Sequence, residues 1–229
     1  LPYALTDAGI VRYGFHGLSY EYIAAQLPAQ LDSGADGRVI VAHLGNGASM
    51  CAMKNRQSVA TTMGFTALDG LMMGRRCGSL DPGVILHLMQ EKGLSVDEVQ
   101  RVLYRESGLL GVSGISNNMQ VLEQQTEPRA KEAIDLFCYR ATREIGSLAA
   151  AIGGLDALVF TAGIGENSVV VRQKICAALD WLGVELDIAA NASSQNQISA
   201  AGAAVDVRVI KTDEESVIAA SSREVLNSC

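Results

Sequence analysis

The sequence of 229 residues lacks the features that mark membrane, secreted and nucleic-acid-binding proteins. It has no apolar run as long as a transmembrane helix needs, and no signal peptide at its N-terminus. Acidic residues outnumber basic ones, 25 to 18, and the net charge is -7. A nucleic-acid surface needs clustered Lys and Arg. We therefore expect neither a membrane partner nor a nucleic-acid partner.

Cysteine is sparse, and its spacing excludes the common cysteine motifs. The five cysteines are scattered, and no two of them form a C-x-x-C pair. This pattern is typical of reduced thiols in a cytoplasmic protein rather than of a disulfide scaffold. The sequence also begins with Leu1 and Pro2 in place of Met, which we interpret as the sign of a piece of a longer protein.

Two common nucleotide-binding motifs are absent. No Gly-x-x-x-x-Gly-Lys-Ser/Thr occurs, which excludes a P-loop. A dinucleotide fingerprint would need a third glycine three residues after Gly165, and Ser168 stands there instead. Any nucleotide site in this chain must therefore belong to another fold.

The most informative local pattern is a glycine-containing stretch that follows an apolar run. Ala157 to Phe160 predicts a buried strand, and Thr161 to Glu166 predicts a loop with two glycines. Asn167 and Ser168 are helix-capping residues, and apolar residues recur at helical spacing from there to Leu182. A strand, a glycine loop and a helix N-terminus can bind a nucleotide, although a tight turn in an ordinary αβ unit explains the same residues.

The rest of the chain alternates between predicted strands and helices. The predicted strands cover residues 39–43, 48–53, 57–62, 157–160 and 207–210, and the first three form a meander because hairpin-forming residues separate them. The predicted helices cover residues 82–92, 96–107, 130–152, 168–182 and 212–226. Residues 189–204 are expected to form a loose connection. His87 is interpreted as structural, on an apolar helical stripe with Leu86 and Met89.

This order of elements predicts an α/β fold, with a mixed sheet flanked by helices. It is the order of a ribonuclease-H-like half, as found in sugar kinases, Hsp70 and actin. Those proteins bind ATP between two such halves, and this chain has the elements of one.

Four segments together resemble the acetate kinase family. They are Arg12 to Ser19, Ala42 to Ser49, Met63 to Gly70 with Met73 to Pro82, and Phe160 to Ser168. The ordered set runs from the start of the chain nearly to its end, so it is far more specific than any single motif. It looks like the C-terminal part of that enzyme, whose first domain is not in this sequence.

The resemblance implies Mg2+-dependent (or Mn2+-dependent) phosphoryl transfer between ATP and acetate, which gives ADP and acetyl phosphate. Acetate is already ionised at neutral pH, so the reaction needs cationic and N–H donors more than acid–base catalysis. His16 matches the family's histidine on the transferring phosphoryl group, and Arg76 matches its second catalytic residue. Without the resemblance we would interpret His16 as a loop histidine. Arg75 is expected to be a solvated neighbour.

The resemblance also implies binding residues for the nucleotide and the acyl group. Phe15 matches a residue of the acyl pocket. The turn from Gly45 to Gly47 matches part of the family's ATP-phosphate loop. Its residues alone predict a β-hairpin turn, and one segment can be both. The implied nucleotide-binding residues are His43, Leu44, Gly45, Asn46 and Gly47, then Asn118, Met119 and Gln120, and then Gly163, Ile164, Gly165, Glu166 and Asn167.

Glu214 matches a family carboxylate that is linked to Mg2+. The neighbouring Glu215 has a structural explanation, because Thr212 and Glu215 have the spacing of a capping box at the start of the last helix. Glu214 has no such explanation, which leaves it available to a metal ion.

Four positions depart from the family pattern in ways that bear on the site. Asn118 and Gln120 stand where the family commonly has Asp and Arg for adenosine, so the nucleotide preference is left open. Ala67 replaces a proline near the acyl pocket, which keeps propionate open as a substrate. Tyr20 replaces a second histidine.

We expect residues 1–213 to form the C-terminal nucleotide-binding domain of an acetate kinase, in a cytoplasmic homodimer. Residues 214–229 are expected to form a terminal helix that packs on the absent N-terminal domain. The alternatives are a propionate or butyrate kinase of the same fold, or a non-catalytic module for nucleotide binding or dimerisation.

Overall fold

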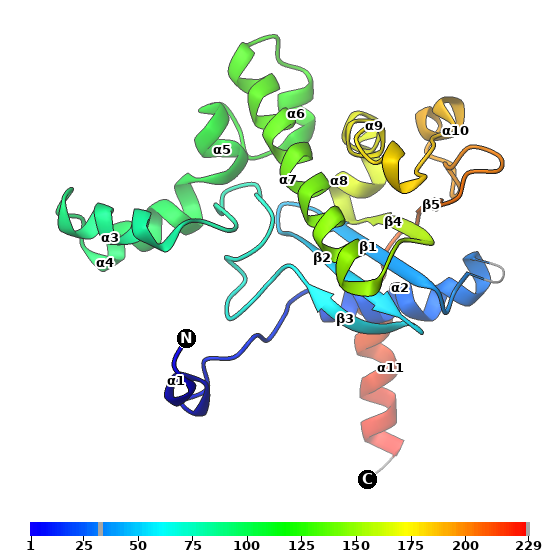
Figure 1. Ribbon diagram of the computed structural model, residues 1–229, viewed down its shortest axis with the longest axis horizontal. Helices are drawn as coiled ribbons and strands as arrows, with labels where there is room; N and C mark the ends of the chain where they lie inside the picture. The colour runs from blue at the N-terminus through cyan, green and yellow to red at the C-terminus, as the bar shows by residue number, and fades with distance from the viewer. Residues whose placement is uncertain (32–33, 228–229) are drawn as a thin grey trace.

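A mixed sheet lies at the centre of the computed structural model, which describes residues 1–31 and 34–227 (Figure 1). The sheet has five strands in the order β3-β2-β1-β4-β5. β1 pairs with β2, and β2 with β3, in antiparallel fashion, whereas β4 and β5 continue the sheet in parallel. The strands are β1 (Arg38–Leu44), β2 (Ala48–Lys54), β3 (Gln57–Thr61), β4 (Ala157–Thr161) and β5 (Asp206–Val209). All five predicted strands, and the meander of the first three, are confirmed.

Helices cover both faces of this sheet (Figure 1). α7 (Pro128–Ile152) and α9 (Val169–Ala177) pack on one face, and α2 (Gly17–Gln30) packs on the other. Because side chains alternate along a strand, Ile40 and Ala42 of β1 face α7, whereas Val39 and Val41 face α2. Both sets are buried, which explains why the strands contain continuous apolar runs.

The long helix α7 agrees closely with its prediction. It begins at Pro128, two positions before the predicted start at residue 130, and Gly153 ends it in the left-handed conformation with φ 79. Its buried stripe includes Ile134, Phe137, Ala141 and Ile145. No helix of the described residues combines the length and the apolar character that a membrane span needs.

Between β3 and α7 the chain forms an arm of short helices that extends away from the sheet (Figure 1). The helices are α3 (Pro82–Gln90), α4 (Val96–Arg101), a π-helix (Val102–Glu106), α5 (Gly108–Ser113) and α6 (Met119–Glu123). The predicted caps Asp81 and Ser95 are confirmed. The expectation that His87 lies on a packed stripe is wrong, because α3 has no buried residue and Leu86 is 56% exposed.

Two predicted irregular segments contain helix. Residues Ala162–Asn167, expected as a glycine loop, form the short helix α8, and Ser168 then caps α9 by accepting from the Val171 N–H. α9 ends at Ala177 rather than near residue 182, where a 3-10 turn (Asp180–Leu182) follows. The predicted loose connection includes α10 (Ile188–Ala192). Small residues gave no helical pattern there, and tertiary contacts decided the conformation.

The last helix, α11 (Glu214–Asn227), lies beside α2 on the side of the sheet opposite α7 (Figure 1). Its predicted capping box is wrong: Asp213 Oδ1 accepts from the Ser216 N–H at 3.0 Å, so Asp213 is the cap in place of Thr212. No residue of α11 is buried, and Ile218 and Val225 are exposed. Residues 228–229 of the predicted terminal helix, and Asp32 and Ser33, lie outside the described residues. The first helix, α1 (Tyr3–Asp7), also buries no residue.

Arg172 of α9 is a fully buried side chain that ties α8 to the rest of the fold. Its guanidinium donates to the carbonyl oxygens of Gly165 and Glu166 at 2.9 and 2.8 Å, and to Asn191 Oδ1 at 2.7 Å. The carbonyls at the C-terminal end of a helix lack intrahelical partners and carry a partial negative charge. Arg172 therefore holds α8 in place by satisfying these acceptors.

We predict that Arg172→Met destabilises the protein by about 3 kcal/mol or more, because it leaves several buried acceptors without a donor. Urea unfolding followed by circular dichroism measures this loss. The exposed Arg129 on α7 supplies the control, and Arg129→Met should change the free energy of unfolding by less than about 0.5 kcal/mol. Equal stabilities of the two variants would contradict the assigned role of Arg172.

Candidate active site

The turn between β1 and β2 is the point where the parts of the candidate site meet. The Gly45 N–H donates to the Gly47 carbonyl at 3.0 Å, so the residues form the hairpin turn that the sequence predicts. The Asn46 carbonyl accepts from the Gly74 N–H at 3.0 Å, and the Asn46 side chain accepts from Asn117 at 3.0 Å. The turn is thus tied to two loops that are distant in the sequence.

Two catalytic candidates lie beside Gly47. A Cβ atom added at Gly47 would be 2.6 Å from Arg76 Nη2 and 3.3 Å from His16 Nε2. One added at Gly74 would be 1.9 Å from Asn46 Oδ1. A side chain at either position would therefore have to displace the Arg76 or the Asn46 side chain from its place, and the structure brings His16 and Arg76 together as predicted.

His16 occupies a position of backbone strain. It precedes α2 in the left-handed conformation with φ 61 and ψ 27, which a non-glycine residue seldom adopts. Its ring stacks on that of His43, with centroids 4.1 Å apart and an interplanar angle of 13°. His16 Nδ1 is 2.7 Å from Ser49 Oγ, and His43 Nδ1 is 2.8 Å from Ser19 Oγ.

Both imidazoles of this stack are neutral near pH 7. Burial lowers the pKa of His16, and the nearby Arg76 charge lowers it further. Burial lowers the pKa of His43 to about 3, with a smaller effect from His16. Burial also lowers the pKa of the Arg76 guanidinium, which remains a cation. The site therefore presents one permanent positive charge and two neutral imidazoles.

Arg76 is held by its own loop. Its Nη1 donates to the Ala67 carbonyl at 2.6 Å, and its carbonyl accepts from the Met73 N–H at 3.1 Å. Arg75, by contrast, is exposed, in agreement with its prediction as a solvated neighbour. Phe15 lines a cavity of about 420 Å³ with Tyr13, Tyr20 and Thr61 among others.

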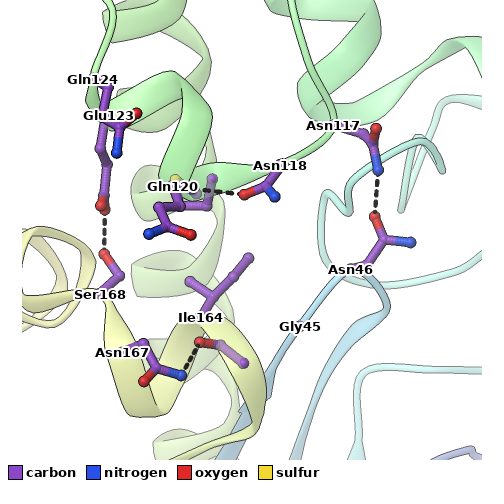
Figure 2. A pocket seen from close by; sticks show the side chains of 12 residues that line it. Gly45, Asn46, Asn117, Asn118, Gln120, Glu123, Gln124, Ile164, Asn167 and Ser168 are labelled. Atoms are coloured by element: carbon purple, nitrogen blue, oxygen red, sulfur yellow. Dashed lines mark hydrogen bonds between the residues drawn. The ribbon is translucent and has the colours of Figure 1, made fainter.

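A larger cavity of about 680 Å³ opens on the other side of the hairpin turn. Figure 2 shows it between α6 and α8, with the Glu123–Ser168 hydrogen bond at one end and the Asn46–Asn117 bond at the other. Its lining residues are Gly45, Asn46, Asn117, Asn118, Met119, Gln120, Glu123, Gln124, Gly163, Ile164, Asn167 and Ser168. Glu123 is the only ionisable residue among them.

The cavity collects most of the predicted nucleotide-binding residues, although they come from three separate segments. Five others stand apart from its lining: His43, Leu44, Gly47, Gly165 and Glu166. Leu44 and Gly165 are buried against the sheet, and a Cβ at Gly165 would lie 3.4 Å from the Phe160 carbonyl carbon. Gly165 thus packs on β4, where a Cβ atom would make an ordinary van der Waals contact, instead of facing the cavity.

The comparisons with known proteins show the family and the fold. The Acetokinase family model matches residues 1–220 of the chain. The chain belongs to the acetokinase family. Its fold is the mixed-sheet α/β fold of acetate and propionate kinases, within the sugar kinase, Hsp70 and actin group.

Relatives in this family cover nearly all of the chain. An acetate kinase of Rhodopseudomonas palustris is 60% identical over 222 residues, which are 96% of this chain and 56% of the relative. The solved acetate kinase of Porphyromonas gingivalis has a TM-score of 0.93 and 39% identity over 99% of this chain and 59% of its own. A solved propionate kinase of Francisella tularensis has a TM-score of 0.90 and 39% identity, and the match covers 96% of this chain and 57% of the propionate kinase chain. The chain thus spans little more than half the length of these relatives.

The acetokinase resemblance also implied a metal ligand, Glu214. Glu214 lines a hollow with Tyr22, Lys211 and Thr212 among others, and this hollow shares no residue with the cavity of Figure 2. Within the described residues, no three His, Cys, Asp or Glu side chains gather into a metal cluster. Mg2+ commonly takes only one or two protein carboxylates and completes its shell with phosphate oxygens and water. A single carboxylate at Glu214 is compatible with such a shared site.

Glu166 has a structural role that the sequence did not indicate. Its Oε1 accepts from the Ala162 N–H at 2.9 Å and from the Thr212 N–H at 3.3 Å. These bonds join the end of β4 to the segment before α11. The carboxylate thus holds the backbone of Thr212, two residues before Glu214, and that of the left-handed Ala162, whose φ is 64.

Sequence reasoning missed several polar residues of the site. Ser49 lies opposite His43 in the β1–β2 register, and this pairing follows from a hairpin centred on Asn46. Ser19 and Tyr20 lie three and four positions after His16, at the spacing of neighbours on a helix. Both signals were present in the sequence. Nothing local, however, indicated the contact of Asn117 with Asn46 or of Glu123 with Ser168.

We predict that His43 makes stability depend on pH. The unfolded state takes up a proton near the ordinary pKa of 6.5, whereas the folded state does so only near 3. The contribution of His43 is therefore complete above about pH 6.5 and is lost as pH falls towards 3, by about 2 kcal/mol between about pH 7 and about pH 5. Denaturant unfolding at these two pH values measures the loss. His43→Gln, which cannot titrate, should show a correspondingly smaller loss, and an unchanged one would refute the assignment.

Proposed function

We propose that the complete protein catalyses reversible phosphoryl transfer between ATP and acetate, and that this chain supplies its nucleotide-binding wall. The observation that supports this most directly is the position of the β1–β2 turn. On one side it borders a polar cavity without Lys or Arg, and on the other it meets Arg76 and His16. These are the two environments that a nucleoside and its terminal phosphates require.

The cavity between α6 and α8 suits a nucleoside rather than a polyphosphate. Its lining has amide side chains and no Lys or Arg, so it has no cation to balance phosphate charge. Asn118 and Gln120 are exposed, and their amides offer both donors and acceptors to a base or a ribose. We propose the nucleotide site here, with the phosphates directed past Asn46 towards Gly47.

The region around Gly47 suits the transferring phosphoryl group. An anionic oxygen in this region can accept from the Arg76 guanidinium and from an imidazole N–H of His16. The transition state of phosphoryl transfer carries charge on its equatorial oxygens, so preorganised donors lower its free energy. The strained backbone of His16 is consistent with this role, because fold contacts hold its ring at the turn.

For the metal we propose Mg2+ (or Mn2+) bound to the nucleotide phosphates, with Glu214 as the protein carboxylate near it. When bound, the ion would neutralise phosphate charge. Asp213 caps α11, and Glu166 holds the Thr212 N–H, so the chain itself keeps the Glu214 backbone in a defined position.

For the acyl acceptor we propose a short carboxylate beside Phe15, with acetate as the main substrate. A propionate or butyrate kinase remains the alternative of the same fold, since the chain is equally identical to an acetate kinase and a propionate kinase of known structure. Ala67 does not favour propionate. Its side chain packs against the main core and it is absent from the lining of the Phe15 cavity.

The uncovered faces of the chain support the proposal that it acts within a larger assembly. The α3–α4 arm exposes Val84, Leu86 and Val96, and α11 exposes Ile218 and Val225. Apolar faces of this kind are usually covered by partner surfaces. We propose a cytoplasmic homodimer, and packing of α11 on the half of the protein that this chain lacks. A non-catalytic module for nucleotide binding or dimerisation is the alternative from another class.

The 229-residue chain alone should bind ATP without forming acetyl phosphate, because positioning and charge neutralisation from the opposite wall account for most of phosphoryl-transfer catalysis. Calorimetry measures ATP binding, and hydroxylamine trapping detects acetyl phosphate in the presence of Mg2+ and acetate. A complete protein is the positive control. Turnover by the 229-residue chain, with its mass confirmed, would show that its active site is not incomplete. Absence of turnover in the complete protein would contradict the proposed function.

In the complete protein, Arg76→Ala should lower turnover by about 10²–10⁴ with little change in ATP affinity, since Arg76 acts on the transferring group. Arg75→Ala is the matched control, because the neighbouring side chain is exposed, and it should retain nearly normal turnover. Steady-state kinetics and ATP titrations of both variants supply the comparison. Similar turnover in the two would remove Arg76 from the catalytic site.

A further inference from the structure

A buried chain of hydroxyl groups ends at His16, on the side of the imidazole away from Gly47. The Tyr20 hydroxyl of α2 bonds to Ser49 Oγ of β2, and Ser49 Oγ is 2.7 Å from His16 Nδ1. Ser49 is fully buried, and Tyr20 is 7% exposed. α2 lies directly on the face of the sheet to which Ser49 belongs (Figure 1). Tyr20 is also the position where the family resemblance expects a second histidine.

The directions of these hydrogen bonds follow from the available acceptors. Within the described residues, the Tyr20 hydroxyl has Ser49 as its hydrogen-bond partner and no other. A buried hydroxyl proton without an acceptor costs free energy, so Tyr20 donates to Ser49. The Ser49 proton is then directed to His16 Nδ1, which must be an acceptor. Reversing the chain would leave the Tyr20 proton buried without a partner.

We propose that Tyr20 and Ser49 are positioning residues that keep His16 neutral, with its single ring proton on Nε2. The opposite ring nitrogen then presents an N–H to the space beside Gly47, where Arg76 Nη2 also lies. The other tautomer would direct a lone pair at an anion in this space and repel it. The catalytic meaning of this arrangement rests on the proposed function of His16, whereas the hydrogen-bond assignment does not.

The surroundings of the ring favour the neutral form as well. The groups that face His16 are the stacked His43 from β1, the hydroxyl of Ser49 from β2, and Arg76 from the loop after β3. The Tyr20 hydroxyl lies behind Ser49 and bonds to it. Burial and the Arg76 charge lower the pKa of His16, and burial raises the pKa of Tyr20, which therefore stays a donor. A donor at Nδ1 stabilises the neutral ring further, since an imidazolium could not accept this bond.

The test is nuclear magnetic resonance of the chain labelled with ¹⁵N-histidine, with the His16 signals assigned from His16→Gln. The wild-type ring should show the Nε2–H tautomer alone at pH 7.5 in long-range ¹H–¹⁵N spectra. Ser49→Ala removes the donor to Nδ1, so Nδ1–H signals should appear and the His16 pKa should rise. Tyr20→Phe should act in the same direction but less strongly, because an unsupported serine is a weaker donor.

Tyr22→Phe is the matched control, since it removes a tyrosine hydroxyl from the same helix away from Ser49 and should leave His16 unchanged. Thermal unfolding of each variant verifies that it is folded. If Ser49→Ala does not fold, Tyr20→Phe still tests the proposal, because its ring conserves the packing of Tyr20. A wild-type Nδ1–H tautomer, or identical His16 spectra in wild type and Tyr20→Phe, would overturn the proposal. In the complete protein, a changed tautomer with full turnover would support the hydrogen-bond chain and refute the proposed role of His16.

Discussion

The antiparallel register of β1 and β2 around Asn46 is the constraint on which the rest of the site depends. It places His43 opposite Ser49, and both side chains then face α2 because side chains alternate along a strand. A shift of one residue would direct them into the core beneath α7. The same hairpin brings Gly47 beside Arg76 and His16, so a Cβ atom at this position would have to displace the Arg76 guanidinium.

The two sides of this turn differ in charge. The cavity beyond Gly45 and Asn46 is lined mainly by amides and small residues, with Glu123 as its one ionisable side chain. The Arg76 guanidinium lies on the other side of the turn, held by the Ala67 carbonyl. A buried cation is costly unless its donors are satisfied. Arg76 retains donors for a ligand, and Arg172 behind α8 uses its own on backbone carbonyls. The same guanidinium chemistry therefore serves ligand binding at Arg76 and support of the fold at Arg172.

Much of this arrangement was predictable from local patterns. The five strands, the long helix α7 and the caps Asp81, Ser95 and Ser168 were found because apolar periodicity and capping residues act within a few positions. The motif resemblance added His16, Arg76 and the cavity residues. The errors occur where local signals are weak or compete. Ala162–Asn167 is helix despite two glycines, because its ends are held by Glu166 and Arg172. Asp213 took the capping role from Thr212, whose N–H is already bonded to Glu166.

The sequence by itself determined the hairpin, the alternation that points His43 and Ser49 to one face, and the family to which the chain belongs. These depend on residue order over short distances or on an ordered set of motifs along the chain. Only the tertiary structure decided that Asn117 reaches Asn46, that Arg76 meets His16 beside Gly47, and that Gly165 packs on β4 instead of lining the cavity. The first two of these contacts join loops that are dozens of residues apart. Their geometry is set by how the helices pack on the sheet, and no local pattern contains that information.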